Sequence, residues 1–180
     1  MIASPETVLA FWREAGPEKW FKKDVTFDDD IRRRFLKTYE AAAAGQLFSW
    51  EQTAESTLAL TIVLDQFPRN MFRGDPRTYA ADPVARAVAD RAIARGFDQK
   101  VSLSDRQFFY LPLEHSELLA DQERCCVLVA ATGDADLLKW AQLHADIVRR
   151  FGRFPHRNAM LGRATTPAEQ AFLDGGGFKG

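Results

Sequence analysis

The chain has 180 residues, of which 46% are hydrophobic and 27% are charged, a composition typical of a globular domain with a core of its own. Its 24 basic residues nearly balance 25 acidic ones, so the net charge is −1, which argues against nucleic-acid binding. No apolar run approaches the roughly 20 residues that span a bilayer. The N-terminus also lacks the basic and apolar regions of a secretory signal. We therefore predict a cytoplasmic protein with no membrane partner.

Helical periodicity dominates the first half of the chain. Ser4 is a capping residue and is followed by Pro5 at the first helical position, so a helix is expected to begin here. Gly16 is expected to end it. Further apolar residues recur at steps of three and four. The helices expected in this half cover residues 4–16, about 28–44, about 51–67 and 82–96. We expect Pro68 to end the third of them, because proline removes a helical hydrogen bond.

The second half repeats this pattern with clearer start signals. Ser104 to Gln107 and Thr166 to Glu169 both fit a capping box. The helices expected here cover residues 104–112, about 114–131, 134–151 and 167–174. The three glycines at 175–177 predict a frayed tail.

The fold class follows from these elements. No segment alternates polar and apolar residues over five or more positions, so strands are not expected. Turn signals separate helices of ordinary length, and no low-complexity linker divides the chain. We predict an all-α fold of stacked antiparallel helical hairpins, as a bundle or short solenoid, forming a single domain over residues 1–180.

Two segments, 65–74 and 151–163, share a motif in which Phe-Pro is followed by Arg-Asn and then by a glycine beside an arginine. Such donor-rich turns need partners, and the planar guanidinium suits carboxylate or phosphate. The predicted ligand-binding residues are Arg69, Asn70, Arg153, His156, Arg157 and Asn158.

Four further residues are candidates for proton transfer. His144 lies within the apolar stripe of the helix over 134–151, either as a hydrogen-bonded core histidine or as a catalytic group. Asp65 ends an apolar stripe and needs a cation, which makes it either a structural ion-pair partner or an active carboxylate. Glu114 and His115 are adjacent, either as helix-start residues or as an acid–base pair.

Metal and cofactor signatures are missing from the sequence. The three histidines lack the four-residue helical spacing of ligands, and no Cys-x-x-Cys or glycine-rich phosphate loop occurs. Cys125 and Cys126 are adjacent, so a bridge between them is not expected, and we predict two buried thiols. We predict no metal and no cofactor.

Three segments together, 64–70, 113–117 and 151–163, resemble the bacterial domain-of-unknown-function family 924 over about Val8 to Leu173. The resemblance implies a tetratricopeptide-like fold of stacked helical hairpins and no established activity. The consensus of tetratricopeptide repeats, with a period of about 34 residues, is not visible in the chain.

Two functions from different classes remain open. In the first, the motifs converge on a pocket that binds or transforms a small carboxylate or phosphate. In the second, a tetratricopeptide-like module binds a peptide or protein while Asp65, Glu114 and Glu117 neutralise the arginines internally. The aromatic residues then expected to be exposed for recognition are Trp20, Phe108, Phe109 and Trp140.

Overall fold

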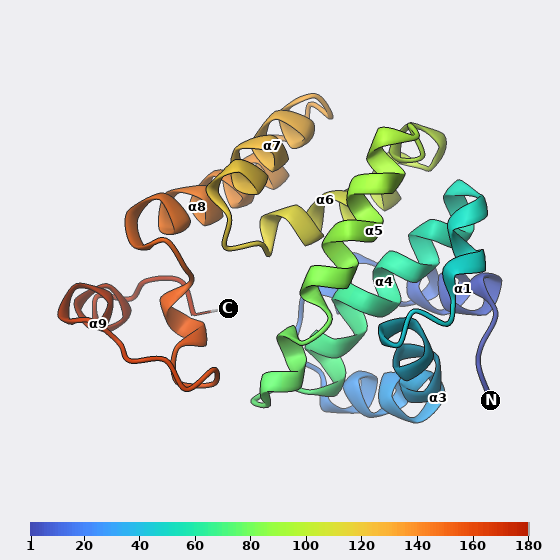
Figure 1. Ribbon diagram of the computed structural model, residues 1–180, viewed down its shortest axis with the longest axis horizontal. Coiled ribbons are helices and arrows are strands. Elements are labelled where there is room, and N and C mark those ends of the chain that lie inside the picture. The colour runs from blue at the N-terminus through green and yellow to red at the C-terminus, as the bar shows by residue number, and fades with distance from the viewer. Residues whose placement is uncertain (180) are drawn as a thin grey trace. The chain divides into compact units, whose positions relative to one another are not determined.

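The computed structural model describes residues 1–179, which are helical and turn structure with no strand (Figure 1). The α-helices are α1 (Pro5–Ala15), α2 (Pro17–Trp20), α3 (Val25–Ala43), α4 (Ala54–Met71), α5 (Asp82–Ala94), α6 (Leu103–Glu114), α7 (Leu119–Ala130), α8 (Ala135–Phe151) and α9 (Pro167–Asp174). Short 3₁₀ helices cover Phe48–Gln52, Pro76–Tyr79, Asp98–Lys100 and Pro155–Arg157. The all-α prediction is confirmed, whereas the tetratricopeptide-like arrangement stays a prediction.

The chain divides into two compact units, which we describe separately. Unit 1 comprises residues 1–73 and 77–112, and unit 2 comprises residues 74–76 and 113–180. The boundary falls within α6, two residues before the end of that helix. Among residues 1–179, no helix combines the length and the apolar character needed to cross a bilayer.

Unit 1 is built around α4, which contacts α1, α3 and α5 (Figure 1). Every side chain from Thr57 to Pro68 is buried, so this helix is enclosed on all faces rather than along one stripe. The Phe67 ring packs against that of Phe35 at a tilt, with centroids 4.9 Å apart, and the Trp12 ring lies 5.8 Å from that of Phe67. Aromatic packing of this kind fixes the end of α4, where the first motif lies.

Several aromatic residues belong to this core, contrary to prediction. Trp20, Phe108 and Phe109 are all buried, and Trp20 and Phe108 meet with centroids 4.9 Å apart. Trp140 is the one predicted recognition residue that is exposed, at 51%. The prediction failed because helical periodicity alone does not identify a helix that is covered on more than one side.

Two predicted helix ends were wrong, and both concern proline. The helix α4 continues through Pro68 to Met71, and α6 continues through Pro112 to Glu114. Each proline lies near the C-terminal end of its helix, so one hydrogen bond is lost while the residues beyond it remain packed. Glu114 therefore ends α6 instead of starting the next helix, which begins at Leu119.

Two helices also start at other residues than predicted. The helix α3 begins at Val25, because the Asp24 carboxylate caps the backbone N–H groups of the first turn. Ser102 rather than Ser104 caps α6, since its hydroxyl accepts a hydrogen bond from the Asp105 N–H at 3.2 Å. The expected capping box starting at Ser104 is thus absent.

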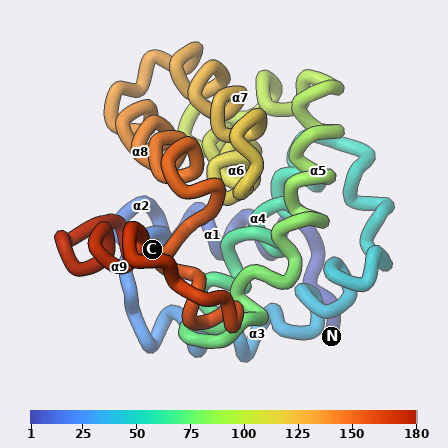
Figure 2. The backbone as a smooth tube through the Cα atoms, turned by 60° about the vertical axis from the view of Figure 1, so that its left-hand side comes forward, coloured from blue at the N-terminus to red at the C-terminus, as the bar shows by residue number. Residues whose placement is uncertain are grey.

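In unit 2, α7 and α8 pack side by side, joined by residues 131–134 (Figures 1 and 2). Asp134 caps the start of α8, and Gly152 ends it in the left-handed conformation, with φ of 70°. Beyond it, Phe154 packs against Ile147 and Val148 of α8 in a small core. The second motif therefore begins at a fixed helix end.

The glycines at 175–177 are also packed, contrary to the predicted frayed tail. The predicted capping box at Thr166 and Glu169 is confirmed and starts α9. The Gly177 N–H then donates a hydrogen bond to the Phe172 carbonyl at 2.9 Å. A Cβ atom at Gly177 would lie 2.6 Å from the Phe172 ring, so the absence of a side chain permits this close contact.

Candidate functional site

Arg69 of the first motif is held between two carboxylates in unit 1. Its Nη1 and Nη2 donate hydrogen bonds to the two Asp82 oxygens at 2.9 and 3.0 Å, and Nη1 lies 3.4 Å from Asp65 Oδ1. Nη1 also donates to the Asp65 carbonyl at 2.6 Å. Burial alone would lower the pKa of Arg69, but Asp65 and Asp82 outweigh that effect and raise it. Arg69 thus cross-links α4 to the start of α5.

Asn70 and Arg73 of the same motif share a second carboxylate, that of Asp28 on α3. Asn70 Nδ2 donates to Asp28 Oδ1 at 2.7 Å, and Arg73 Nε donates to Asp28 Oδ2 at 2.6 Å. Asp28 and Asn70 are both buried. The first motif therefore joins the end of α4 to two neighbouring helices through charge-assisted hydrogen bonds.

Glu169 organises one side of the second motif in unit 2. Arg153 donates to its two oxygens at 2.6 and 2.9 Å, and Asn158 Nδ2 donates to Oε2 at 3.2 Å. The Thr166 N–H donates to Oε2 at 2.7 Å. Hydrogen bonding, first from Arg153 and then from Thr166 and Asn158, lowers the pKa of Glu169 to about 2. Arg153 and Asn158 thus tie the motif to α9.

Glu117 organises the other side of that motif. Arg163 donates to its two oxygens at 2.7 and 3.0 Å, and the Phe154 N–H donates to Oε1 at 2.8 Å. Burial raises the pKa of Glu117, but hydrogen bonds from Arg163 and Phe154 outweigh it, so the pKa lies below its usual value. Glu117 therefore neutralises an arginine, Arg163, within the protein, as the peptide-binding interpretation of the sequence expects.

Arg157 is the most enclosed arginine of the second motif, with 6% of the residue exposed. Its Nη2 donates to the His115 carbonyl at 3.0 Å, and its guanidinium lies 4.5 Å from the centroid of the Phe154 ring. This arrangement combines a hydrogen bond with a cation–π contact. The predicted residue His115 contributes its backbone oxygen here.

Glu114 and His144 form a buried pair in unit 2. His144 Nδ1 lies 3.2 Å from Glu114 Oε1 and 2.9 Å from the Trp140 carbonyl. Both neighbours of Nδ1 are acceptors when the carboxyl is ionised, which assigns a proton to Nδ1 and leaves the lone pair of the neutral ring on Nε2. Both alternatives from the sequence, a hydrogen-bonded core histidine and a basic imidazole, are compatible with this geometry.

His156 lies close to the same pair. The His144 and His156 rings lie 5.6 and 5.7 Å from the Phe154 ring, and 4.6 and 5.2 Å from the Phe178 ring. His156 Nδ1 is buried and has no hydrogen-bond partner among the described residues. Burial, followed by Arg157 and His144, lowers the pKa of His156 to about 3, so its ring is neutral near pH 7.

The predicted residues thus fall into three groups. Glu114, His144, His156 and Arg157 gather around Phe154 in unit 2, whereas Arg153 and Asn158 attach to Glu169. In unit 1, Arg69 contacts both Asp65 and Asp82, and Asn70 donates a hydrogen bond to Asp28. That the two motifs converge stays a prediction.

The acidic partners of the motifs were not predicted from the sequence; they are Asp28, Asp82 and Glu169. Glu169 carried a signal as the last residue of a capping box, and Asp82 as the first residue of an expected helix. Asp28 was interpreted as a helix-start residue. None of these signals identifies which arginine or asparagine a carboxylate will meet.

Metal-binding side chains do not gather in the described part of the chain, since no group of three or more His, Cys, Asp or Glu residues there has suitable geometry. Cys125 is buried and Cys126 half-buried, and neither forms a disulfide with a described residue, so the prediction of two buried thiols holds for Cys125 alone. Burial raises the pKa of each thiol.

Comparison with known proteins identifies the family. A family model described as "Bacterial protein of unknown function (DUF924)" matches residues 8–177. The solved structure of a protein of unknown function, ATU0120 from Agrobacterium tumefaciens, is 50% identical, with 95% of this chain and 97% of that chain covered and a TM-score of 0.92. No curated protein matches. Because the family model spans nearly the whole sequence, the chain belongs to the DUF924 family of bacterial proteins.

Proposed function

We propose that the chain binds a small carboxylate or phosphate at the cluster formed by Glu114, His144, His156 and Arg157 in unit 2. We further propose that the Glu114–His144 pair moves a proton there. The observation that carries the proposal is the buried pair itself, with 3.2 Å between His144 Nδ1 and Glu114 Oε1, beside a second imidazole that shares the same aromatic neighbours.

The proton-transfer role follows from the chemistry of His144. A carboxylate that accepts from Nδ1 raises the basicity of the ring and fixes its tautomer, so that a proton would be taken up or given at Nε2. Glu114 is thus a positioning residue, and His144 is the group that takes or gives the proton. Burial of both side chains strengthens their interaction, since few water molecules screen it.

Anion binding would draw on Arg157 and His156. The guanidinium of Arg157 supplies a positive charge inside the cluster. The neutral ring of His156 supplies one N–H donor without the cost of a second buried cation. A carboxylate or phosphate is also the acceptor that a guanidinium and an imidazole N–H bind best together, which supports a ligand of negative charge.

Arg69, Asn70, Arg153 and Asn158 would then be structural residues that fix the motif turns. Their donors already meet the carboxylates of Asp82, Asp28 and Glu169. For these residues the proposal therefore adopts the structural interpretation. A catalytic role for Asp65 stays a prediction.

The proposal is tested by thermal melts and calorimetry with phosphate and acetate as probes. We expect one of the two probes to raise the melting temperature of the wild type. His156→Asn should weaken binding of that probe about tenfold, because one hydrogen bond to the anion is lost. The matched control is Arg149→Gln, which removes an exposed guanidinium from α8. Equal weakening by the control, or no saturable binding of either probe, contradicts the proposal.

Proton transfer needs a separate measurement. Calorimetry in two buffers with different ionisation enthalpies reports the protons exchanged on binding. We expect a proton exchange in the wild type that Glu114→Gln and His144→Asn both remove. A purely structural pair would leave this quantity unchanged in variants that still fold.

One observation favours a second candidate, a tetratricopeptide-like module that binds a peptide or protein. Trp140 is 51% exposed on α8, and Val127 is exposed on α7. Aromatic residues at a surface are frequent anchors for partners. If this function holds, Trp140→Ala abolishes binding of a partner while anion probes have no effect on the melting temperature.

A further inference from the structure

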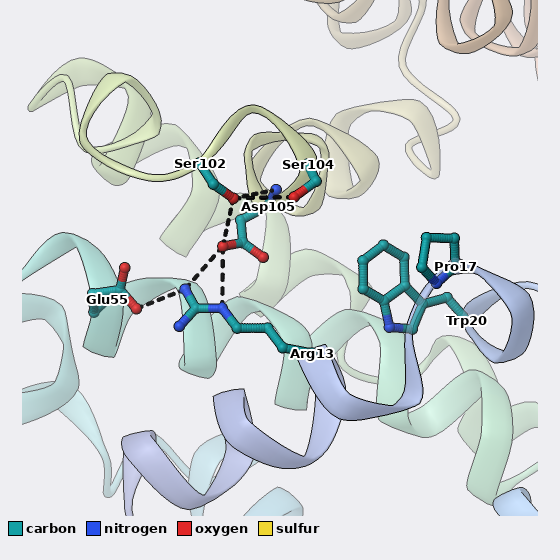
Figure 3. A pocket seen from close by; sticks show the side chains of 7 residues that line it. All are labelled: Arg13, Pro17, Trp20, Glu55, Ser102, Ser104 and Asp105. Atoms are coloured by element: carbon teal, nitrogen blue, oxygen red, sulfur yellow. Dashed lines mark hydrogen bonds and ion pairs between the residues drawn. The ribbon is translucent and has the colours of Figure 1, made fainter.

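Unit 1 contains an open hollow of about 460 Å³ that no residue of either motif lines (Figure 3). Residues from α1 and α2, from the start of α4 and from the start of α6 surround it. The residues that matter here are Arg13, Trp20, Glu55, Ser104 and Asp105. The hollow lies in a different unit from the cluster proposed above, so it can be tested independently.

Asp105 is the central group of this hollow, and its side chain is 6% exposed. Its Oδ2 accepts hydrogen bonds from Arg13 Nε at 3.1 Å, from Arg13 Nη2 at 2.9 Å and from Ser102 Oγ at 2.8 Å. Within residues 1–179, no hydrogen bond reaches Oδ1, which points away from Arg13 toward the side of Trp20 in Figure 3. A carboxylate oxygen so placed favours a donor entering from the hollow.

The charges around the hollow favour a cation over an anion. Glu55 and Asp105 are negative, and Arg13 is the one positive side chain among the lining residues. Arg13 is already engaged, because its Nη2 also donates to Glu55 Oε2 at 2.8 Å. One negative charge is therefore left over, and an incoming anion would have to displace a carboxylate from Arg13.

The remaining walls fit an apolar stem. Trp20 and Pro17 lie on the side of the hollow toward which Asp105 Oδ1 points (Figure 3). The indole nitrogen of Trp20 donates to the Trp12 carbonyl at 2.7 Å, so the ring is fixed in place. An aromatic ring beside a carboxylate attracts an organic cation through its π electrons as well as through apolar contact.

We propose that this hollow binds a primary alkylammonium group. The ammonium donates hydrogen bonds to Asp105 Oδ1 and to the Ser104 hydroxyl, while its alkyl stem lies against Trp20 and Pro17. Glu55 adds a longer-range attraction, since its side chain is half-exposed and is partly neutralised by Arg13. Two sources carry this chemistry, a free diamine and the lysine side chain of a peptide.

The test measures binding of cadaverine by calorimetry, with pentanol and pentanoate as a neutral and an anionic probe of similar length. We expect saturable binding of cadaverine, no binding of the other two, and a loss of about tenfold in Asp105→Asn, which removes the charge but keeps the shape. A short peptide with one lysine forms the second arm. Tighter binding of cadaverine identifies a free diamine as the source of the ammonium group, and tighter binding of the peptide identifies a lysine side chain.

Asp105 also holds Arg13, so its variant can lose stability, and Ser104→Ala provides a second test at an exposed position. We expect Ser104→Ala to weaken binding about fivefold, the loss of a single acceptor. Ser49→Ala, at an exposed serine away from the hollow, should leave binding unchanged. The proposal is overturned if pentanoate binds in place of cadaverine, if cadaverine shows no saturation, or if Ser104→Ala and Ser49→Ala behave alike.

Discussion

Arg69 and Arg91 each hold a carboxylate through two hydrogen bonds, to Asp82 and to Glu51, but their side chains are 18% and 53% exposed. Solvent screens the pair at Arg91 and keeps the Arg91 guanidinium hydrated when Glu51 is removed. Removing a partner from the buried pair leaves an uncompensated charge in a poorly solvated place. The same residue types should therefore have very different effects on stability.

This contrast gives the first prediction. Asp82→Asn should lower the free energy of unfolding by about 3 kcal/mol, because Arg69 loses half of its neutralising charge. Glu51→Gln, the matched control, should cost less than about 1 kcal/mol. Urea denaturation followed by circular dichroism measures both values, and similar costs would show that the Arg69 pair is not held as a buried cross-link.

His156 gives a prediction about pH. Its pKa of about 3 lies below its ordinary value of 6.5, so between these values the unfolded chain binds a proton that the folded chain does not. Stability must therefore fall as the pH drops below about 6.5. Between about pH 6.5 and pH 5 we expect this residue to account for about 1 kcal/mol, after allowance for partial exposure.

Urea denaturation at these two pH values in the wild type and in His156→Asn checks this contribution. The window lies above the range in which Glu169, with its pKa of about 2 and an ordinary value of 4.5, loses its own contribution as the pH falls. If both proteins lose the same stability across the window, His156 titrates normally in the folded state.

At the residue scale, the sequence predicted the donors better than their acceptors. Arginine and asparagine in a repeated motif are visible without a structure, since both types need partners in a turn. The partner of Arg153 is Glu169, 16 positions away, and the partner of Asn70 is Asp28, 42 positions away. Pairings over such separations are set by how helices pack, which a local pattern does not contain.

Among the elements, α9 has the clearest local signal. Thr166 Oγ1 accepts from the Glu169 N–H at 3.3 Å, and the Glu169 carboxylate accepts from the Thr166 N–H at 2.7 Å. The box therefore starts the helix and also holds the carboxylate that receives Arg153. Its loss should affect both the helix and the second motif.

We predict that Thr166→Ala lowers the free energy of unfolding by about 1 kcal/mol, the usual cost of losing an N-cap. The control, Thr166→Ser, keeps a hydroxyl in the same place and should retain most of the stability. Hydrogen exchange at residues 168–170 should accelerate in the alanine variant, because the first turn of α9 loses its cap. Unchanged exchange there would mean that packing alone fixes this turn.

At the element scale, caps were more reliable signals than prolines. Ser4, Asp134 and Thr166 each cap the helix expected after them. Pro68 and Pro112 did not end their helices, because burial of the residues beyond them outweighs the loss of one hydrogen bond. The burial of Phe67 and Met71 on opposite sides of Pro68 depends on the tertiary core and could not be deduced from that segment.

For the whole molecule, helical periodicity was enough to predict the all-α class, because most of the α-helices are long enough to show a period of 3.6 residues. The four-residue helix α2 is too short to show it and was not predicted. The division into two compact units was not predicted, since no linker marks the boundary. Instead the last boundary falls inside α6, at Pro112. The single domain over residues 1–180 stays a prediction.

The chain carries natural probes that can test this single-domain prediction. Trp12, Trp20 and Trp50 lie in unit 1, whereas Cys125 and Cys126 lie in unit 2. In the variant Trp140→Phe, tryptophan fluorescence reports on unit 1 alone, and alkylation of the buried Cys125 reports on unit 2. If the chain is one cooperative domain, both signals and the helical circular dichroism change at the same urea concentration. Thiol alkylation completed at a urea concentration that leaves the fluorescence native would show that unit 2 unfolds separately, and the prediction of one domain over residues 1–180 would then be wrong.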